Sequence, residues 1–183
     1  MIRRKLSIVA LGLAALVSAL PAARAASFDY ITSSDGTPLC VYETGNPQGR
    51  PLLFIHGFSQ SYAVFKRQFE SDLAKDFRIV AFDLRGHGCS GKPWSETAYA
   101  GTKIWADDVA AVIAARKLVR PVIVGWSFGG YVTVDYIRHY GNDGAAALVL
   151  IGSNAGLPPA PTDPAALAKL AAQREANKTL PPD

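Results

Sequence analysis

The sequence predicts an α/β fold, in which a mostly parallel β-sheet carries helices on both faces. Short apolar runs alternate along the chain with longer stretches of helical periodicity, and the runs lie at 52–55, 78–82, 122–124 and 147–151. Glycine, proline and small polar residues separate these segments. Residues capable of chemistry follow three of the runs, where open α/β sheets place their active groups.

The first 25 of the 183 residues are typical of a secretory signal peptide. This segment has a basic start, an apolar run at 6–20 and an A-x-A cleavage site that ends at Ala25. The apolar run is about 15 residues, whereas a membrane-spanning helix needs about 20. We therefore expect cleavage after Ala25, export to the periplasm or beyond, and no membrane contact after cleavage.

The charge balance outside this leader does not suggest binding to nucleic acid or to an acidic membrane surface. The formal charge of +4 comes from 19 basic and 15 acidic residues, and four of the basic ones lie in residues 1–25, which hold no acid. The rest of the chain is neutral and long enough for one domain. Nothing in the composition predicts an oligomeric state.

The predicted elements begin with a β-hairpin, whose strands at 28–32 and 39–43 flank a Ser-Asp-Gly turn. After the strand at 52–55, apolar periodicity predicts one helix over 63–74. Its apolar side would carry Val64, Phe65, Phe69 and Leu73.

The second half repeats the strand–helix alternation. The strand at 78–82 leads through Asp83 into a glycine-rich loop, and a helix over 103–117 follows, with Thr102 as its N-cap. The remaining elements are a strand at 122–124, a helix over 127–140 that stops at Gly141, and a strand at 147–151.

The stretch Gly-Trp-Ser-Phe-Gly, residues 125–129, matches G-x-S-x-G between a strand and a helix. A sharp, strained turn there would lift the Ser127 hydroxyl above the sheet. Gly125 and Gly129 would let strand and helix pass closely. The amide of Phe128, at the helix N-terminus, could stabilise an oxyanion. The pattern predicts a nucleophilic Ser127.

With these residues the chain resembles the α/β-hydrolase family from residue 28 to about residue 155. Three segments carry the resemblance: His-Gly-Phe at 56–58, Asp-Leu-Arg-Gly-His-Gly-Cys-Ser at 83–90, and the turn at 125–129, which we call the elbow. The stretch RGHGCSGKPW, residues 85–94, looks most like serine esterases of the subgroup that includes cofactor-free haloperoxidases (perhydrolases).

The resemblance implies an α/β-hydrolase fold and a small-molecule acyl substrate, with no cofactor and no metal. It implies that Phe58 supplies the second oxyanion amide, and that His56 and Gly57 support the loop. Because the elbow residue is serine, the pattern argues against haloalkane dehalogenases and epoxide hydrolases, which use a carboxylate. We therefore expect hydrolysis of small esters or related acyl compounds through an acyl-serine intermediate.

The acid and base of a triad are missing from the positions where this fold places them, since the order is serine, acid, histidine. His139 is the one histidine after Ser127, and twelve helical residues separate the two by about 18 Å. Asp135 lies about 12 Å from the serine. Asp143 lies in the turn after this helix, Ser153 and Asn154 are not carboxylates, and Asp163 and Asp183 lie in the Pro/Ala-rich tail.

We therefore expect an N-terminal fragment whose sheet is truncated after about the sixth strand and whose acid and histidine lie beyond residue 183. In this interpretation 26–155 form the first part of the core. Residues 156–183, with a helical pattern around 165–177, begin a lid. Such a chain would be inactive alone. The alternative is a non-catalytic α/β-hydrolase-like binding protein.

Two further patterns bear on cofactors and metals. Residues 86–91 spell G-x-G-x-x-G, but Pro93 breaks any helix that the glycines could open, so a dinucleotide site is not predicted. His87, in the same loop, is interpreted as structural. In the fold that the chain resembles, Cys40 and Cys89 come close, and either a disulfide or two free thiols is compatible with the sequence. Their spacing predicts no zinc site.

Overall fold

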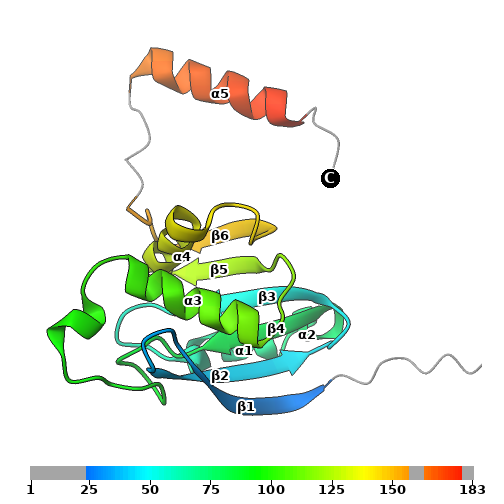
Figure 1. Cartoon of the computed structure of the whole chain (residues 1–183). Coiled ribbons are helices and arrows are strands. Elements are labelled where there is room, and N and C mark those ends of the chain that lie inside the picture. Colours follow the sequence, from blue (N-terminus) through cyan, green and yellow to red (C-terminus); the bar gives the residue numbers. More distant parts are fainter. Residues whose placement is uncertain (1–23, 157–162, 179–183) are drawn as a thin grey trace, which may run out of the picture.

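A six-stranded sheet forms the centre of the protein (Figure 1), in the order β1-β2-β4-β3-β5-β6. The computed structural model describes residues 24–156 and 163–178, so the predicted signal peptide lies outside it up to residue 23. The four strands β3 to β6 pair in parallel, and β1 and β2 add an antiparallel extension next to β4. The predicted fold class is confirmed. The strands are β1 (Arg24–Thr32), β2 (Pro38–Gly45), β3 (Arg50–Ile55), β4 (Phe77–Phe82), β5 (Val122–Trp126) and β6 (Ala147–Ile151).

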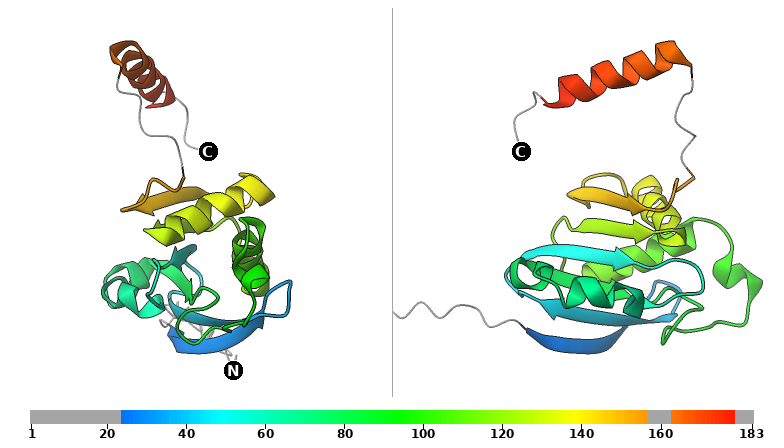
Figure 2. Two further views of the ribbon diagram at one scale, coloured as in Figure 1. Left: turned by 90° about the vertical axis from the view of Figure 1, so that its left-hand side faces the viewer. Right: turned by 180° about the vertical axis from the view of Figure 1, so that it is seen from behind.

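Helical segments cover both faces of this sheet, as predicted. In the left view of Figure 2, the green α3 and yellow α4 lie on one side of the strands, and the teal segment with α1 and α2 lies on the other. Alternation along β3 supplies both cores: Leu53 and Ile55 pack with α3 and α4, and Leu52 and Phe54 pack with Phe69. The longer helices are α3 (Lys103–Ala115), α4 (Phe128–Tyr140) and α5 (Pro164–Lys178).

The single helix predicted over 63–74 is wrong. The structure has a 3₁₀ turn, η1 (Tyr62–Phe65), followed by two short helices, α1 (Lys66–Phe69) and α2 (Leu73–Asp76). Ser71 interrupts the helix because its hydroxyl donates to the carbonyl of Gln68 at 2.8 Å, which offers the backbone an alternative to helical bonding. Phe65 and Phe69 are buried as expected, but Val64 and Leu73 are each 37 % exposed.

The limits of the longer helices differ slightly from the prediction, since α3 ends at Ala115 and not at residue 117, and α4 begins at Phe128. Thr102 stands at the N-cap position of α3 but makes no capping hydrogen bond, and its hydroxyl lies 2.8 Å from Nε2 of His139 instead. Gly141 ends α4 with a φ of +80°, which glycine adopts without strain. Another 3₁₀ turn, η2 (Glu96–Tyr99), lies in the loop before α3. No helix of the described residues is long and apolar enough to cross a membrane.

A disulfide joins Cys40 in β2 to Cys89 in the loop after β4, with the two Cα atoms 5.6 Å apart. The sequence left this pairing open against free thiols, and the structure decides it. The antiparallel register places Val41 opposite Phe82, and the N–H of Asp83 donates to the carbonyl of Cys40 at 2.9 Å. The loop that leaves β4 therefore starts beside Cys40.

Reduction of this disulfide is expected to lower the free energy of unfolding by about 2–4 kcal/mol, because the bond closes a loop between residues 49 positions apart. Urea unfolding with and without a thiol-free reductant measures the change. The double variant Cys40→Ala, Cys89→Ala is the control, since its unfolding midpoint should not respond to the reductant. An unchanged midpoint in the wild type would show that the bond does not restrict the unfolded chain.

Candidate active site

The Ser127 elbow has the strained backbone that the sequence predicts. Ser127 adopts φ +52° and ψ −116°, in a region that non-glycine residues rarely occupy. It follows β5 directly and precedes the first residue of α4, and its N–H donates to the carbonyl of Ile151 at 2.9 Å. The side chain is half-buried. The turn thus places a serine hydroxyl at the carboxyl edge of the parallel strands.

The two elbow glycines allow strand and helix to pass at backbone distance. A Cβ on Gly125 would lie 2.6 Å from the carbonyl oxygen of Gly129, and a Cβ on Gly129 would overlap the carbonyl oxygen of Ile55. Both residues have ordinary φ values, so the requirement is for space. This places Gly125 and Gly129 in the close approach that the motif predicts.

The loop after β3 lies against the elbow. A Cβ on Gly57 would stand 3.1 Å from the Cβ of Ser127, so the next residue, Phe58, begins beside the serine. Among the described residues, the N–H groups of Phe58 and Phe128 donate no backbone hydrogen bond. The two amides predicted for an oxyanion hole are therefore both available near Ser127.

His56 is a structural residue in this geometry. Its side chain is fully buried, and its Nε2 accepts a hydrogen bond from the N–H of Leu84 at 3.0 Å. Nδ1 therefore carries the proton and donates to the carbonyl of Gly57 at 2.8 Å. Burial lowers the pKa of His56, so the ring stays neutral although Asp83 lies 3.8 Å away. His56 thus joins the turn after β3 to Leu84, and its role in supporting the loop that presents Phe58 stays a prediction.

An open pocket of about 480 Å³ lies beside the elbow and is mostly aromatic. Phe58 and Phe128 meet edge to face with centroids 6.2 Å apart, and Trp105 of α3 meets Phe128 at 5.2 Å. No Asp, Glu, Lys or Arg lines it, so its lining suits a neutral, apolar group. The lining residues are Phe58, Ser59, Gly86, His87, Tyr99, Trp105 and Phe128.

Neither candidate from α4 can act as a base for Ser127. His139 is in the last turn of α4, about 18 Å from the serine by helical rise, and it contacts Thr102. The carboxylate of Asp135 accepts a hydrogen bond from Arg138 at 2.9 Å. Within residues 24–156 and 163–178, the Ser127 hydroxyl has no hydrogen-bond partner.

The geometry agrees with comparisons against known proteins. The family model described as the alpha/beta hydrolase fold matches residues 50–178. The chain belongs to the α/β-hydrolase family. As an α/β-hydrolase it is 36 % identical, over 115 residues, to the AB hydrolase superfamily protein YisY of Bacillus subtilis, covering 62 % of this chain and 41 % of that protein.

Two further relatives carry esterase names. The chain is 36 % identical over 125 residues to the bifunctional esterase/perhydrolase DCH of Acinetobacter calcoaceticus, covering 68 % of this chain and 44 % of that protein. The crystal structure of the esterase RhEst1 from Rhodococcus sp. ECU1013 superposes with a TM-score of 0.65 and 42 % identity, covering 69 % of this chain and 46 % of that one. The predicted resemblance of the chain to esterases and perhydrolases is thus confirmed. The chain spans less than half the length of these relatives.

A buried ion cluster around Arg85, in the loop that follows β4, was not predicted from the sequence. The fully buried guanidinium of Arg85 donates to Asp108 at 2.7 and 2.6 Å and to Asp35 at 2.7 Å. The hydrogen bonds from Arg85 lower the pKa of Asp35 to about 2. A signal was present: Asp108 stands beside Val109 and one turn before Val112, on the apolar side of its helix, where a charge requires a partner.

Proposed function

We propose that this chain carries the nucleophile and the oxyanion amides of a serine hydrolase for small esters or related acyl compounds. The observation that carries the proposal is Ser127 in a strained elbow beside two unoccupied amides, those of Phe58 and Phe128. In this mechanism Ser127 Oγ attacks the acyl carbonyl and the alcohol leaves. Water then releases the acid from acyl-Ser127, and the amides stabilise the oxyanion in both steps.

The mechanism requires a base and an orienting acid outside these 183 residues. A serine hydroxyl must lose its proton to a group about 3 Å away, and His139 is too distant. The aromatic pocket beside the elbow would then hold the apolar part of the acyl compound. Activity of the 183-residue chain alone should therefore be negligible.

Hydrolysis of p-nitrophenyl acetate tests this expectation. Loss of the histidine in a serine triad lowers kcat by about 10⁶-fold, so the wild-type chain and Ser127→Ala should release nitrophenol at the same rate. A kcat of about 1 s⁻¹ or more, within tenfold of the median enzyme value, would contradict the missing base if Ser127→Ala abolished it.

The non-catalytic binding protein is the competing function, and a Ser127 hydroxyl without a partner among residues 24–156 and 163–178 is compatible with it. A chimera discriminates between the two functions. It joins residues 26–155 of this chain to the C-terminal part of RhEst1, the esterase that is 42 % identical to this chain over the matched region. In this family the acid and histidine follow the elbow in the chain, so a catalytic elbow should give ester hydrolysis that Ser127→Ala removes. A folded chimera without that activity would favour the binding protein.

We also propose export of the protein. The basic start and the apolar run of residues 1–25 support it, and a disulfide such as Cys40–Cys89 persists in oxidising compartments. Fractionation of cells that express the chain should place it outside the cytoplasm, with a new N-terminus at Ala26. Recovery of uncleaved protein from the cytoplasm would contradict the signal peptide.

A further inference from the structure

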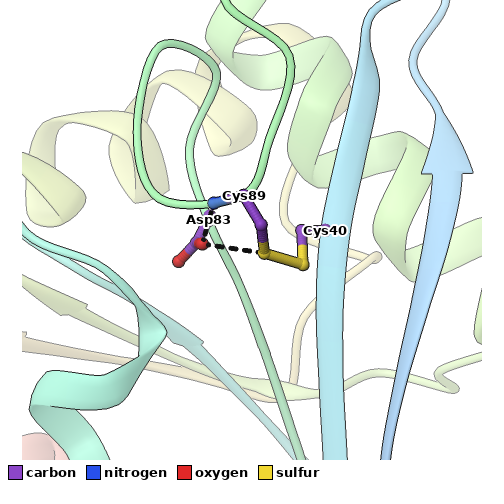
Figure 3. Close-up of side chains that lie close together, drawn as sticks. All are labelled: Cys40, Asp83 and Cys89. Carbon is purple, nitrogen blue, oxygen red and sulfur yellow. Dashed lines mark hydrogen bonds between the residues drawn. A yellow bond between two sulfur atoms is a disulfide. The ribbon is translucent and has the colours of Figure 1, made fainter.

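Three side chains meet where β2 passes the end of β4 (Figure 3). One ligand atom from each of Cys40, Asp83 and Cys89 lies within 4.8 Å of the other two. In the oxidised protein the two sulfur atoms are bonded to each other and offer no thiolate. Reduction by a dithiol adds two electrons and two protons, and it leaves two thiols beside one carboxylate.

Hydrogen bonds that do not depend on the disulfide hold these three residues in place. The N–H of Cys40 donates to Ser90 Oγ at 2.9 Å, and that hydroxyl donates to the carbonyl of Asp83 at 2.5 Å. The N–H of Cys89 donates to the Asp83 carboxylate at 2.8 Å. A Cβ on Gly88 would overlap that carboxylate, so the loop wraps closely around it. We expect the cluster to keep its arrangement after reduction.

The spacing suits a tetrahedral cation. Asp83 Oδ2 lies 3.3 Å from Cys89 Sγ, a contact without a hydrogen bond in the oxidised chain because that sulfur carries no hydrogen. With Zn–S bonds of about 2.3 Å and Zn–O bonds of about 2.0 Å, two ligand atoms of one zinc ion lie about 3.5–3.8 Å apart. The Cα atoms of the two cysteines are 5.6 Å apart, so side-chain rotation can bring both sulfurs to that separation.

Burial and charge favour the same ligand. Cys40 and Asp83 are buried, whereas Cys89 is exposed, which gives a cation an entry path and leaves room for a water as fourth ligand. Two thiolates and a carboxylate carry three negative charges in a small volume, and a divalent cation neutralises most of them. Thiolates select a soft or borderline ion over calcium or magnesium.

We propose that reduced Cys40 and Cys89, together with the Asp83 carboxylate, form a site for a thiophilic divalent cation such as Zn²⁺. The cation displaces two thiol protons when it binds. Exchange with an external disulfide, which takes up two electrons and two protons and leaves as a dithiol, forms the Cys40–Cys89 bond again and releases the cation. Metal binding and the disulfide therefore exclude each other. The cysteine spacing predicted no such site, because the ligands come together only through the strand pairing. The proposal is independent of ester hydrolysis.

Cadmium titration of the chain, made without a histidine tag and reduced with a phosphine under nitrogen, tests the site. The thiolate-to-cadmium charge-transfer absorption should saturate at one ion per reduced chain and should reverse when excess zinc competes. The oxidised chain is the matched control, since it has the same sequence and no thiolate. The melting temperature of the reduced chain should rise with zinc, and that of the oxidised chain should not change. Equal cadmium binding by the two forms would overturn the proposal.

Asp83→Asn separates the three-ligand site from a simple pair of thiols. Changes outside the ligand shell already lower metal affinity by about 10–100-fold, so loss of a direct ligand should cost at least as much. Asp143→Asn, in the exposed turn before β6, should bind as the wild type does. If circular dichroism shows Asp83→Asn unfolded, Cys89→Ser at the exposed position replaces it and should lose the absorption band. Wild-type affinity in folded Asp83→Asn, or a full band in Cys89→Ser, would exclude the proposed site.

Discussion

Gly129→Ala is expected to lower the free energy of unfolding by about 3 kcal/mol or more. A Cβ there would overlap the carbonyl oxygen of Ile55 and lie 2.7 Å from that of His56. Both atoms belong to the backbone of β3 and the turn after it, so they cannot rotate away. Helix propensity alone predicts the opposite sign, since alanine is favoured over glycine inside a helix by about 0.5–1 kcal/mol. The cost of the steric overlap exceeds this gain in helix propensity, because α4 must move away from the sheet to relieve the overlap.

Urea unfolding followed by circular dichroism measures the change. Gly141→Ala is the matched control at the other end of α4: a Cβ there would meet nothing within 4 Å, and the cost of about 1–2 kcal/mol comes only from the φ of +80°. The close approach would be refuted if Gly129→Ala were no more damaging than Gly141→Ala. If Gly129→Ala folds with α4 displaced, Ser127 should also move away from Gly57. The close contact between these two residues is part of the geometry of the site.

The sheet and the elbow could be predicted from the sequence because their signals are local. β5 begins with a β-branched run that stops at Gly125, and Ser127 lies between this glycine and Gly129. The helix over 63–74 could not be predicted correctly, because its apolar periodicity runs through Ser71 without a glycine or proline. The hydroxyl of Ser71 bonds to the carbonyl of Gln68, and the apolar pattern carries no sign of that bond.

The parts of the candidate site that one short segment encodes could be predicted from the sequence. The contacts between residues on different strands and helices could not. Ser127 and the glycines around it follow from five consecutive residues. The Cys40–Cys89 bond depends on the register of β2 against β4, which the sequence leaves open. The partners of Arg85 come from the first hairpin and from α3, so no spacing along the chain reveals them.

Arg85→Met is expected to lower the free energy of unfolding at neutral pH by about 3–5 kcal/mol. The substitution keeps an unbranched side chain but leaves the fully buried carboxylate of Asp108 without its guanidinium. Denaturant unfolding measures the loss. Lys75→Met is the matched control, because Lys75 and Asp72 form an ion pair at the same 2.6 Å distance on the exposed surface. That variant should show no measurable change, since exposed pairs are screened by solvent.

The pH dependence of Arg85→Met identifies the cause. Burial raises the pKa of Asp108 above its usual value already in the wild type, and removal of Arg85 should raise it further. A carboxyl whose pKa is raised by folding destabilises the protein above that pKa and ceases to do so as pH falls towards its unfolded value. In the wild type Asp35, with its pKa at about 2, stabilises the fold above pH 3.8, and this contribution is lost as pH falls towards 2. Asp108 therefore predicts that the difference between variant and wild type shrinks as pH falls from its raised pKa towards 3.8, and Asp35 predicts a further decrease between pH 3.8 and about 2.

The double variant Arg85→Met, Asp108→Leu separates an unpaired charge from lost packing. Replacing both partners of a buried ion pair by apolar residues is often neutral, so the double variant should recover most of the stability that Arg85→Met loses. Asp35 remains, but its side chain is 34 % exposed and can be solvated. If the double variant were as unstable as Arg85→Met at pH 7, the loss would come from the hydrogen bond of Arg85 to the carbonyl of Ala98 and from packing. The buried carboxylate would then not be the cause.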